Sequence, residues 1–290
     1  MPCGTHTGES GMTASTLDEL LRARFGEWGT APAQAQGSST LRDLAAHRSH
    51  RRFEQRAVDP ALIDTALACA FTAPAKSDLQ QACVIRVEEA ALRARIDALF
   101  PRAAWVATAP VFLVWCGDNR RIRRICELRG KPFANDHLDS FFNASVDCAL
   151  VMDSFIRAAG AIGLGCCPLS ELRNNCTEVG ELLALPPYVF PVAGMVVGWP
   201  AGEGMISPRL QPAITWHRDR YDDGDLERQI AAYDARRSAL QPIAREKQRD
   251  TQRHGVAQDY GWSEDKARQV AEPARDDFGA FVRAQGFRLE

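Results

Sequence analysis

The sequence of 290 residues contains no long apolar run and no export signal. No stretch approaches the roughly 20 consecutive apolar residues that a transmembrane helix needs. Residues 1–12 contain Gly, Thr and Glu where a signal peptide would have a basic start followed by an apolar segment. We therefore expect a soluble, cytoplasmic protein without a membrane partner.

Regular cysteine spacing is also missing. The nine cysteines include no C-x-x-C pair, which argues against a zinc ribbon and a disulfide framework and favours reduced thiols. We expect no bound metal. The adjacent Cys166 and Cys167 are interpreted as small buried hydrophobes and not as a redox pair, because a vicinal disulfide needs a strained peptide.

The chain has no excess of charge of either sign. Its formal net charge is −2, so no overall positive field favours nucleic acid or anionic lipid. The basic run over residues 120–131 is compatible with a nucleic-acid patch. Arginines interleaved with apolar residues at helical spacing are more often a solvated helix face. The expected partner is a small molecule, and no nucleic acid is expected.

The 46% of hydrophobic residues can supply the core of one large domain or two small ones. Residues 1–14 are predicted to be a disordered leader, 16–25 an amphipathic helix, and 30–39, rich in Ala, Pro, Gln, Gly and Ser, a linker. Beyond residue 221 the chain is polar and helical with an apolar end, typical of an arm that docks elsewhere, for instance on a partner subunit. The predicted parts are an N-terminal extension and linker (1–40), a core (41–221) and a helical C-terminal arm (222–290).

Short strands alternate with longer helices between these ends. Large apolar residues follow one another over 109–116, which predicts a strand buried on both faces. Two more strands are predicted over 84–87 and 189–199, and residues 166–170 are expected to lead into a turn. The long helix expected over 141–163 carries small residues, which place it centrally or at a subunit interface. This order predicts an α+β or α/β fold.

The densest group of polar side chains is the sequence HRSHRRF, which follows an apolar helical pattern. His47, Arg48, Ser49 and Arg51 would offer fork-shaped donors and a hydroxyl to a phosphate and to an electron-rich ring edge. Taken alone, the run is more typical of a solvated basic face. Both interpretations stay open at this point.

A second polar group, KSDLQ (residues 76–80), comes one helix later. Ser77, followed three residues later by Gln80, has the form of a capping box at a helix N-terminus. The alternative is that Lys76, Ser77 and Gln80 face a ligand. The pattern slightly favours the cap, and the two interpretations are compatible.

Several motifs together resemble one protein family. HRSHRRF, APAKSDLQQ, APVFLVWCGD, GLGCCPLSELRNN, LLALPPYVFPVAGMVVGWP and SPRL occur in this order between Leu41 and Tyr221. In order and spacing they resemble the FMN-dependent nitroreductase family, nearer its NADPH-linked nitroreductase and flavin reductase branch. A looser match continues into WSEDKARQV and FVRAQGF.

The resemblance implies an α+β fold with a central, mainly antiparallel mixed sheet flanked by helices, and an intertwined homodimer with FMN at its interface. It implies that His47, Arg48, Ser49 and Arg209 hold the FMN phosphate and that Arg51 lies beside the flavin pyrimidine edge. Further cofactor contacts are implied for Lys76, Ser77, Gln80, Pro168, Leu169 and Ser170, the last three under the ring. Bidentate cations suit phosphate, and a guanidinium stabilises the negative charge of a reduced flavin.

The implied activity is that of an FMN oxidoreductase. Electrons would pass from NAD(P)H through the flavin to a nitroaromatic, a quinone or another flavin, with no protein acid or base required. The alternatives are a dedicated reductase or reductive dehalogenase of one aromatic metabolite, and an FMN-binding module without turnover. The sequence departs from the branch at Ser170-Glu171, where Gly-Gly is frequent, and at Ser207, where a Lys often precedes Pro-Arg.

Overall fold

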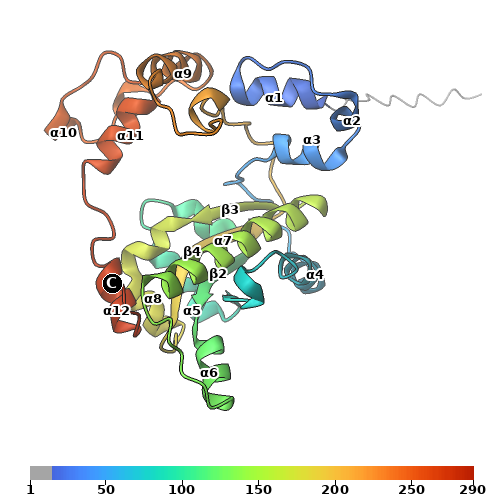
Figure 1. The fold of residues 1–290 in the computed structure, drawn as a ribbon. Helices are drawn as coiled ribbons and strands as arrows, with labels where there is room; N and C mark the ends of the chain where they lie inside the picture. The colour runs from blue at the N-terminus through green and yellow to red at the C-terminus, as the bar shows by residue number, and fades with distance from the viewer. Residues whose placement is uncertain (1–14) are drawn as a thin grey trace, which may run out of the picture. The chain divides into compact units, whose positions relative to one another are not determined.

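The computed structural model describes residues 15–290, so the leader predicted over residues 1–14 lies outside it. The described residues form two compact units. Unit 1 comprises residues up to His47 together with Ile206–Ala267, and unit 2 comprises Arg48–Met205 together with Arg268–Glu290. Figure 1 shows the fold of both units.

Unit 2 is built on an antiparallel sheet. Its four strands lie in the order β1-β2-β4-β3, with β1 at Ala82–Arg86, β2 at Val111–Asp118, β3 at Gly165–Leu169 and β4 at Val189–Gly198. The three strands predicted from the sequence are confirmed. The turn expected after residues 166–170 is present as a 3-10 segment at Ser170–Asn175. Residues 165–169 themselves pair with β4 and form a strand that the sequence did not indicate. Pro168 is tolerated there because β3 is an edge strand.

Unit 2 also contains helices, some of which cover the two faces of this sheet. They are α4 (Pro60–Ala70), α5 (Ala90–Ala98), α6 (Arg120–Leu128), α7 (Leu138–Ala161), α8 (Cys176–Leu182) and α12 (Phe278–Ala284), with the 3-10 turns η1 (Lys76–Asp78), η2 (Ala104–Thr108) and η3 (Ser170–Asn175).

Strand β2 is buried on both faces, as its apolar sequence predicts. Phe112 and Val114 pack with residues of α5, η2, η3 and α8. Leu113 and Trp115 belong to the opposite cluster, with residues of α4 and α7. Because successive side chains of a strand point to opposite faces, a run without polar interruption suits a strand covered on both sides.

Helix α7 crosses the sheet and packs against α4 (Figure 1). Ala144, Cys148, Val151 and Phe155 recur at helical spacing and are buried. The long helix predicted over 141–163 is confirmed, and one of its faces is buried in the core of unit 2. The C-terminal α12 packs within the same unit, where Val282 joins residues of α7 and β4 in one apolar cluster.

Unit 1 is helical in the described residues. It contains α1 (Leu17–Phe25), α2 (Ala33–Gln36), α3 (Ser39–Ala46), η4 (Pro212–Ile214), α9 (Leu226–Leu240), η5 (Arg245–Lys247), α10 (Thr251–His254) and most of α11 (Trp262–Val270).

The helix predicted over 16–25 is confirmed as α1, and Thr16 and Glu19 form a capping box at its start. The linker predicted over residues 30–39 is wrong. The Asp18 carboxylate accepts hydrogen bonds from the Ala31 amide (2.8 Å) and the Gln36 side chain (2.7 Å), which fold this segment onto α1. The Ala31 amide is the main reason why the pKa of Asp18 lies below its usual value.

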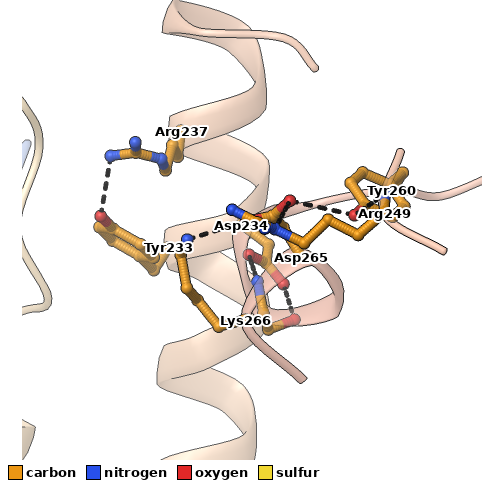
Figure 2. A network of polar contacts seen from close by, with 8 residues as sticks. Tyr233, Asp234, Arg237, Arg249, Tyr260, Asp265 and Lys266 are labelled. Atoms are coloured by element: carbon orange, nitrogen blue, oxygen red, sulfur yellow. Dashed lines mark hydrogen bonds and ion pairs between the residues drawn. The ribbon is translucent and has the colours of Figure 1, made fainter. Parts of the chain in front are cut away.

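Polar contacts tie the chain after α9 to that helix (Figure 2). Asp234 of α9 accepts a hydrogen bond from the Ser263 amide at 2.9 Å. Asp265 accepts from the Tyr260 hydroxyl and from Arg249, both at 3.0 Å. The polar sequence beyond residue 221 is therefore held within unit 1 as far as α11. Within residues 15–290, no helix is long and apolar enough to cross a membrane.

Candidate functional site

The part of HRSHRRF from Arg48 onward belongs to unit 2, where His50 lies beside the edge strand β3. The His50 amide donates to the Cys166 carbonyl at 3.0 Å. A Cβ atom on Gly165 would lie only 2.7 Å from Cγ of His50, so glycine at this position allows the close approach. Further along, Phe53 is buried and the Glu54 amide donates to the Trp199 carbonyl at 2.9 Å. These contacts hold residues 50–54 against β3 and against the residue that follows β4.

Arg51 is exposed, and its guanidinium lies next to the Cys167 thiol. Burial raises the pKa of Cys167, whereas the charge of Arg51 and a hydrogen bond from it act in the opposite direction. Burial also raises the pKa of the Cys166 thiol. Both cysteines are unpaired by disulfides and buried in the apolar clusters on opposite faces of the sheet. The interpretation of these cysteines as small buried hydrophobes agrees with this placement.

Pro168 and Leu169 end β3 and Ser170 follows it, so these residues lie one to three positions past Cys167, which Arg51 contacts. Leu169 is buried opposite Gly194 of β4, Pro168 is half-buried, and Ser170 is exposed at the start of η3. The structure thus brings Arg51 and the end of β3 together in one unit. A role of these residues under a flavin ring stays a prediction.

The KSDLQ segment adopts an unusual backbone and forms no capping box. No side-chain hydrogen bond caps the short turn η1, so the predicted cap is wrong. Ser77, Asp78 and Gln80 have φ angles of 49°, 56° and 53°. Such left-handed conformations cost about 1 kcal/mol or more for each residue that is not glycine. Strained backbone of this kind persists where the surroundings hold it, frequently at ligand sites.

Asp147 of α7 anchors both ends of this loop. Its side chain is 1% exposed. One carboxylate oxygen accepts from the Lys76 amide at 2.9 Å, and the other accepts from the Gln81 amide at 3.1 Å. A buried carboxylate is stable only if hydrogen bonds replace its hydration, and the loop amides provide them. The sequence analysis did not single out Asp147, although an acidic residue next to Cys148, in the row of apolar positions that includes Ala144 and Val151, was the available signal.

The basic run over residues 120–131 supports the same loop. Arg121 donates to the Gln80 carbonyl and pairs with Asp118 at 2.9 Å. Arg123 contacts Asp136 at 2.5 Å, and its guanidinium lies 3.9 Å from the Tyr188 ring centroid. These intramolecular contacts favour a structural use of the run over a nucleic-acid patch.

His47 and Arg209 belong to unit 1. His47 follows the last residue of α3 and is half-buried. The Arg209 side chain is exposed, and its amide donates to the Arg24 carbonyl at 2.6 Å. The preceding Pro208 carbonyl accepts from the hydroxyl of Tyr233, which Figure 2 shows with Arg237 on α9. The grouping of His47 and Arg209 with Arg48, Ser49 and Arg51 of unit 2 stays a prediction.

These features define an α+β protein in which a basic segment runs along the edge of an antiparallel sheet. The family model described as "Nitroreductase family" matches residues 44–199, and that described as "Nitroreductase family, C-terminal domain" matches residues 207–290. The chain belongs to the nitroreductase family.

Individual relatives indicate which branch of the family the chain belongs to. A protein of Bacillus subtilis (strain 168) named FMN reductase (NAD(P)H) is 29% identical over 256 residues, which cover 87% of this chain and 99% of the relative. An oxygen-insensitive NADPH nitroreductase of Salmonella typhimurium is 34% identical over 198 residues, covering 68% of this chain and 80% of the relative. The solved structure of B. megaterium NfrA2 superimposes with a TM-score of 0.78 at 31% identity, covering 87% and 99%. The chain therefore lies in the flavin reductase and NADPH nitroreductase branch, as the resemblance indicated.

The anchoring role of Asp147 can be tested by substitution. Asp147→Ala leaves two loop amides without their acceptor, so we expect the free energy of unfolding to fall by about 2 kcal/mol or more. Equilibrium denaturation measures this change. The control is Asp153→Ala on the same helix, which removes only an exposed pair with Arg157 and should change stability by less than about 1 kcal/mol. Equal effects of the two variants would contradict the anchoring role.

Proposed function

We propose that this chain is an NAD(P)H-dependent FMN oxidoreductase that reduces an electron-poor acceptor such as a nitroaromatic, a quinone or a flavin. The observation that carries the proposal is the match with an FMN reductase over 99% of that relative's length. When bound, FMN supplies the redox chemistry by taking a hydride from the nicotinamide and passing electrons to the acceptor. The residues of this chain bind and orient the reactants.

The donor set of the structure fits FMN. The cofactor has an anionic phosphate at one end and a flat, partly apolar ring system at the other. The basic segment at residues 48–51 lies beside β3, whose end offers the half-buried Pro168 and the buried Leu169. Fork-shaped guanidinium groups suit a phosphate, and an apolar strand end suits the ring.

In this proposal each predicted residue has a defined contact. His47, Arg48, Ser49 and Arg209 bind the phosphate, and Arg51 lies at the pyrimidine edge of the ring. Pro168, Leu169 and Ser170 support the ring, and the anchored loop contributes Lys76, Ser77 and Gln80. The FMN ligands then fall within residues 41–221, flanked by the extension (1–40) and the arm (222–290).

The proposed activity is tested by purifying the full chain and recording its absorbance spectrum. We expect a yellow protein with noncovalently bound FMN, whose 450 nm band is bleached by anaerobic addition of NADH or NADPH. Acceptors are then added one class at a time. FMN that stays yellow with both nicotinamides would indicate a binding module without turnover, whereas reoxidation by one halogenated or other aromatic metabolite alone would indicate a dedicated reductase. A protein that cannot be loaded with FMN would contradict the proposal.

The position of Arg51 predicts an effect on the flavin potential. A guanidinium at the pyrimidine edge interacts more strongly with reduced FMN, which carries more negative charge there. Arg51→Met should lower the midpoint potential by several tens of millivolts, since about 30 mV corresponds to about 1.4 kcal/mol for a two-electron couple. A dye-equilibrated reductive titration measures it. Arg52→Met, which removes the neighbouring exposed charge, is the control. Coinciding midpoints of the Arg51 variant and the parent at full FMN occupancy would show that Arg51 is misplaced.

A homodimer is the assembly that the surface of α7 supports. Leu138, Phe142, Val146 and Leu150 recur every four residues on this helix and are each between 38% and 60% exposed. An apolar stripe of this kind on a soluble protein marks an interface, and a two-fold axis would pair it with its own copy. The anchored loop contacts the same helix through Asp147.

Phe142→Asp tests this assembly. A twofold interface would bury the new carboxylate twice, so we expect light scattering to give a monomer mass where the parent gives a dimer. Leu128→Asp, at a more exposed apolar position on α6, should stay dimeric. Circular dichroism checks that both variants are folded. A folded Phe142 variant that retains the dimer mass would rule out this surface as the interface.

The eight cysteines within the described residues form no disulfide. Reduced thiols and the use of a nicotinamide donor both suit the cytoplasm. We therefore place the enzyme there.

A further inference from the structure

The chain before residue 44 lies outside both family matches, yet much of it is folded into unit 1. Leu17 and Leu20 of α1 are buried against Ala31 and Ala45. Thr16 caps the start of α1, and the Asp18 carboxylate accepts hydrogen bonds from the Ala31 amide and the Gln36 side chain. These contacts hold residues 31–36 against α1. The segment is therefore a structural part of unit 1, and it can act on the residues that unit 1 carries.

Arg24, near the end of α1, connects the N-terminal segment to other parts of unit 1. Its side chain is 6% exposed. The guanidinium donates to the carbonyls of Ala45 and Ser207, each at 2.9 Å, and to the carbonyl of His47. The Arg24 carbonyl in turn accepts the Arg209 amide at 2.6 Å. One residue of the N-terminal segment thus holds two chain segments that lie about 160 residues apart in the sequence.

Phe25, which follows Arg24, also bonds to the segment around Arg209. The Phe25 carbonyl accepts hydrogen bonds from Arg236 of α9 and from Gln211. Arg236 also donates to the Arg209 carbonyl at 2.5 Å. Both backbone polar groups of Arg209 are therefore held, the amide by Arg24 and the carbonyl by Arg236. The exposed Arg209 side chain extends from a backbone with a defined position.

We propose that Arg24 is a positioning residue for the cofactor phosphate, and that the N-terminal segment is therefore part of the cofactor site. The inference rests on the proposed function, in which His47 and Arg209 bind the FMN phosphate. The Arg24 guanidinium donates to the carbonyl of His47 and to that of Ser207, two residues before Arg209, and the Arg24 backbone carbonyl accepts from the Arg209 amide. A binding site is effective only when the groups around its ligands keep them in place, and a guanidinium with three carbonyl acceptors in two segments does so.

The test compares two ligands that differ only in the phosphate. FMN and riboflavin share the ring system, so the ratio of their dissociation constants isolates the phosphate contribution. Fluorescence titration of the full-length, FMN-depleted protein gives both constants. We expect Arg24→Ala to weaken FMN by about tenfold or more, the size expected from losing a charged hydrogen bond, and to leave riboflavin binding unchanged. Arg24→Lys keeps the positive charge but loses the branched guanidinium, so its ratio of FMN to riboflavin dissociation constants should lie between those of the parent and Arg24→Ala.

The matched control is Arg22→Ala, which removes an exposed charge from the same helix and should retain the parental ratio. A second control combines Arg24→Ala with Arg209→Ala. If Arg24 acts through Arg209, the losses of FMN affinity should be less than additive.

Three outcomes decide the inference. An Arg24→Ala ratio equal to the parent's overturns it, also when both ligands weaken equally, because that result indicates a general structural role. If Arg24→Ala does not fold, the ratio for Arg24→Lys decides in the same way. If the parent protein itself does not distinguish FMN from riboflavin, the proposed phosphate site fails, and the positioning role fails with it.

Discussion

The antiparallel pairing of β2 with β4 is the constraint on which the candidate site in unit 2 depends. Strand β4 lies between β2 and β3, and its register sets Leu169 opposite Gly194. The His50 amide is bonded to β3, so the basic segment takes its position from the same register. Apolar clusters cover both faces of the sheet. A shift of the strand register by one residue would therefore move the Trp115 side chain from its own cluster to the one on the opposite face. The core thereby determines where Arg51 lies.

Two buried charged side chains of opposite sign hold backbone segments in place, one in each unit. Asp147 accepts hydrogen bonds from loop amides in unit 2, and Arg24 donates to carbonyls in unit 1. Burying either charge is costly unless several hydrogen bonds replace water. Because both residues bind backbone atoms, they define the course of a segment without occupying the side chains of its proposed cofactor ligands. Such support suits a site whose ligands come from distant parts of the chain.

Much of the fold follows from local patterns in the sequence. The apolar run of β2, the amphipathic pattern of α1 and the spacing of α7 each predict an element that the structure contains. The errors occurred where an element depends on a distant partner. Residues 165–169 form a strand because β4 pairs with them, and residues 30–39 fold because Asp18 binds them.

For the candidate site, the sequence by itself determined which residue types are present: the guanidinium groups of HRSHR, the polar loop KSDLQ and the apolar end of β3. Order and spacing of these motifs were sufficient to indicate the family. Only the tertiary structure decided that Arg51 lies beside Cys167, that Asp147 holds a strained loop beginning 71 residues earlier, and that Arg24 joins His47 to Arg209. Periodicity reports the local conformation of the chain, whereas buried polar groups find their partners only when distant segments have packed together.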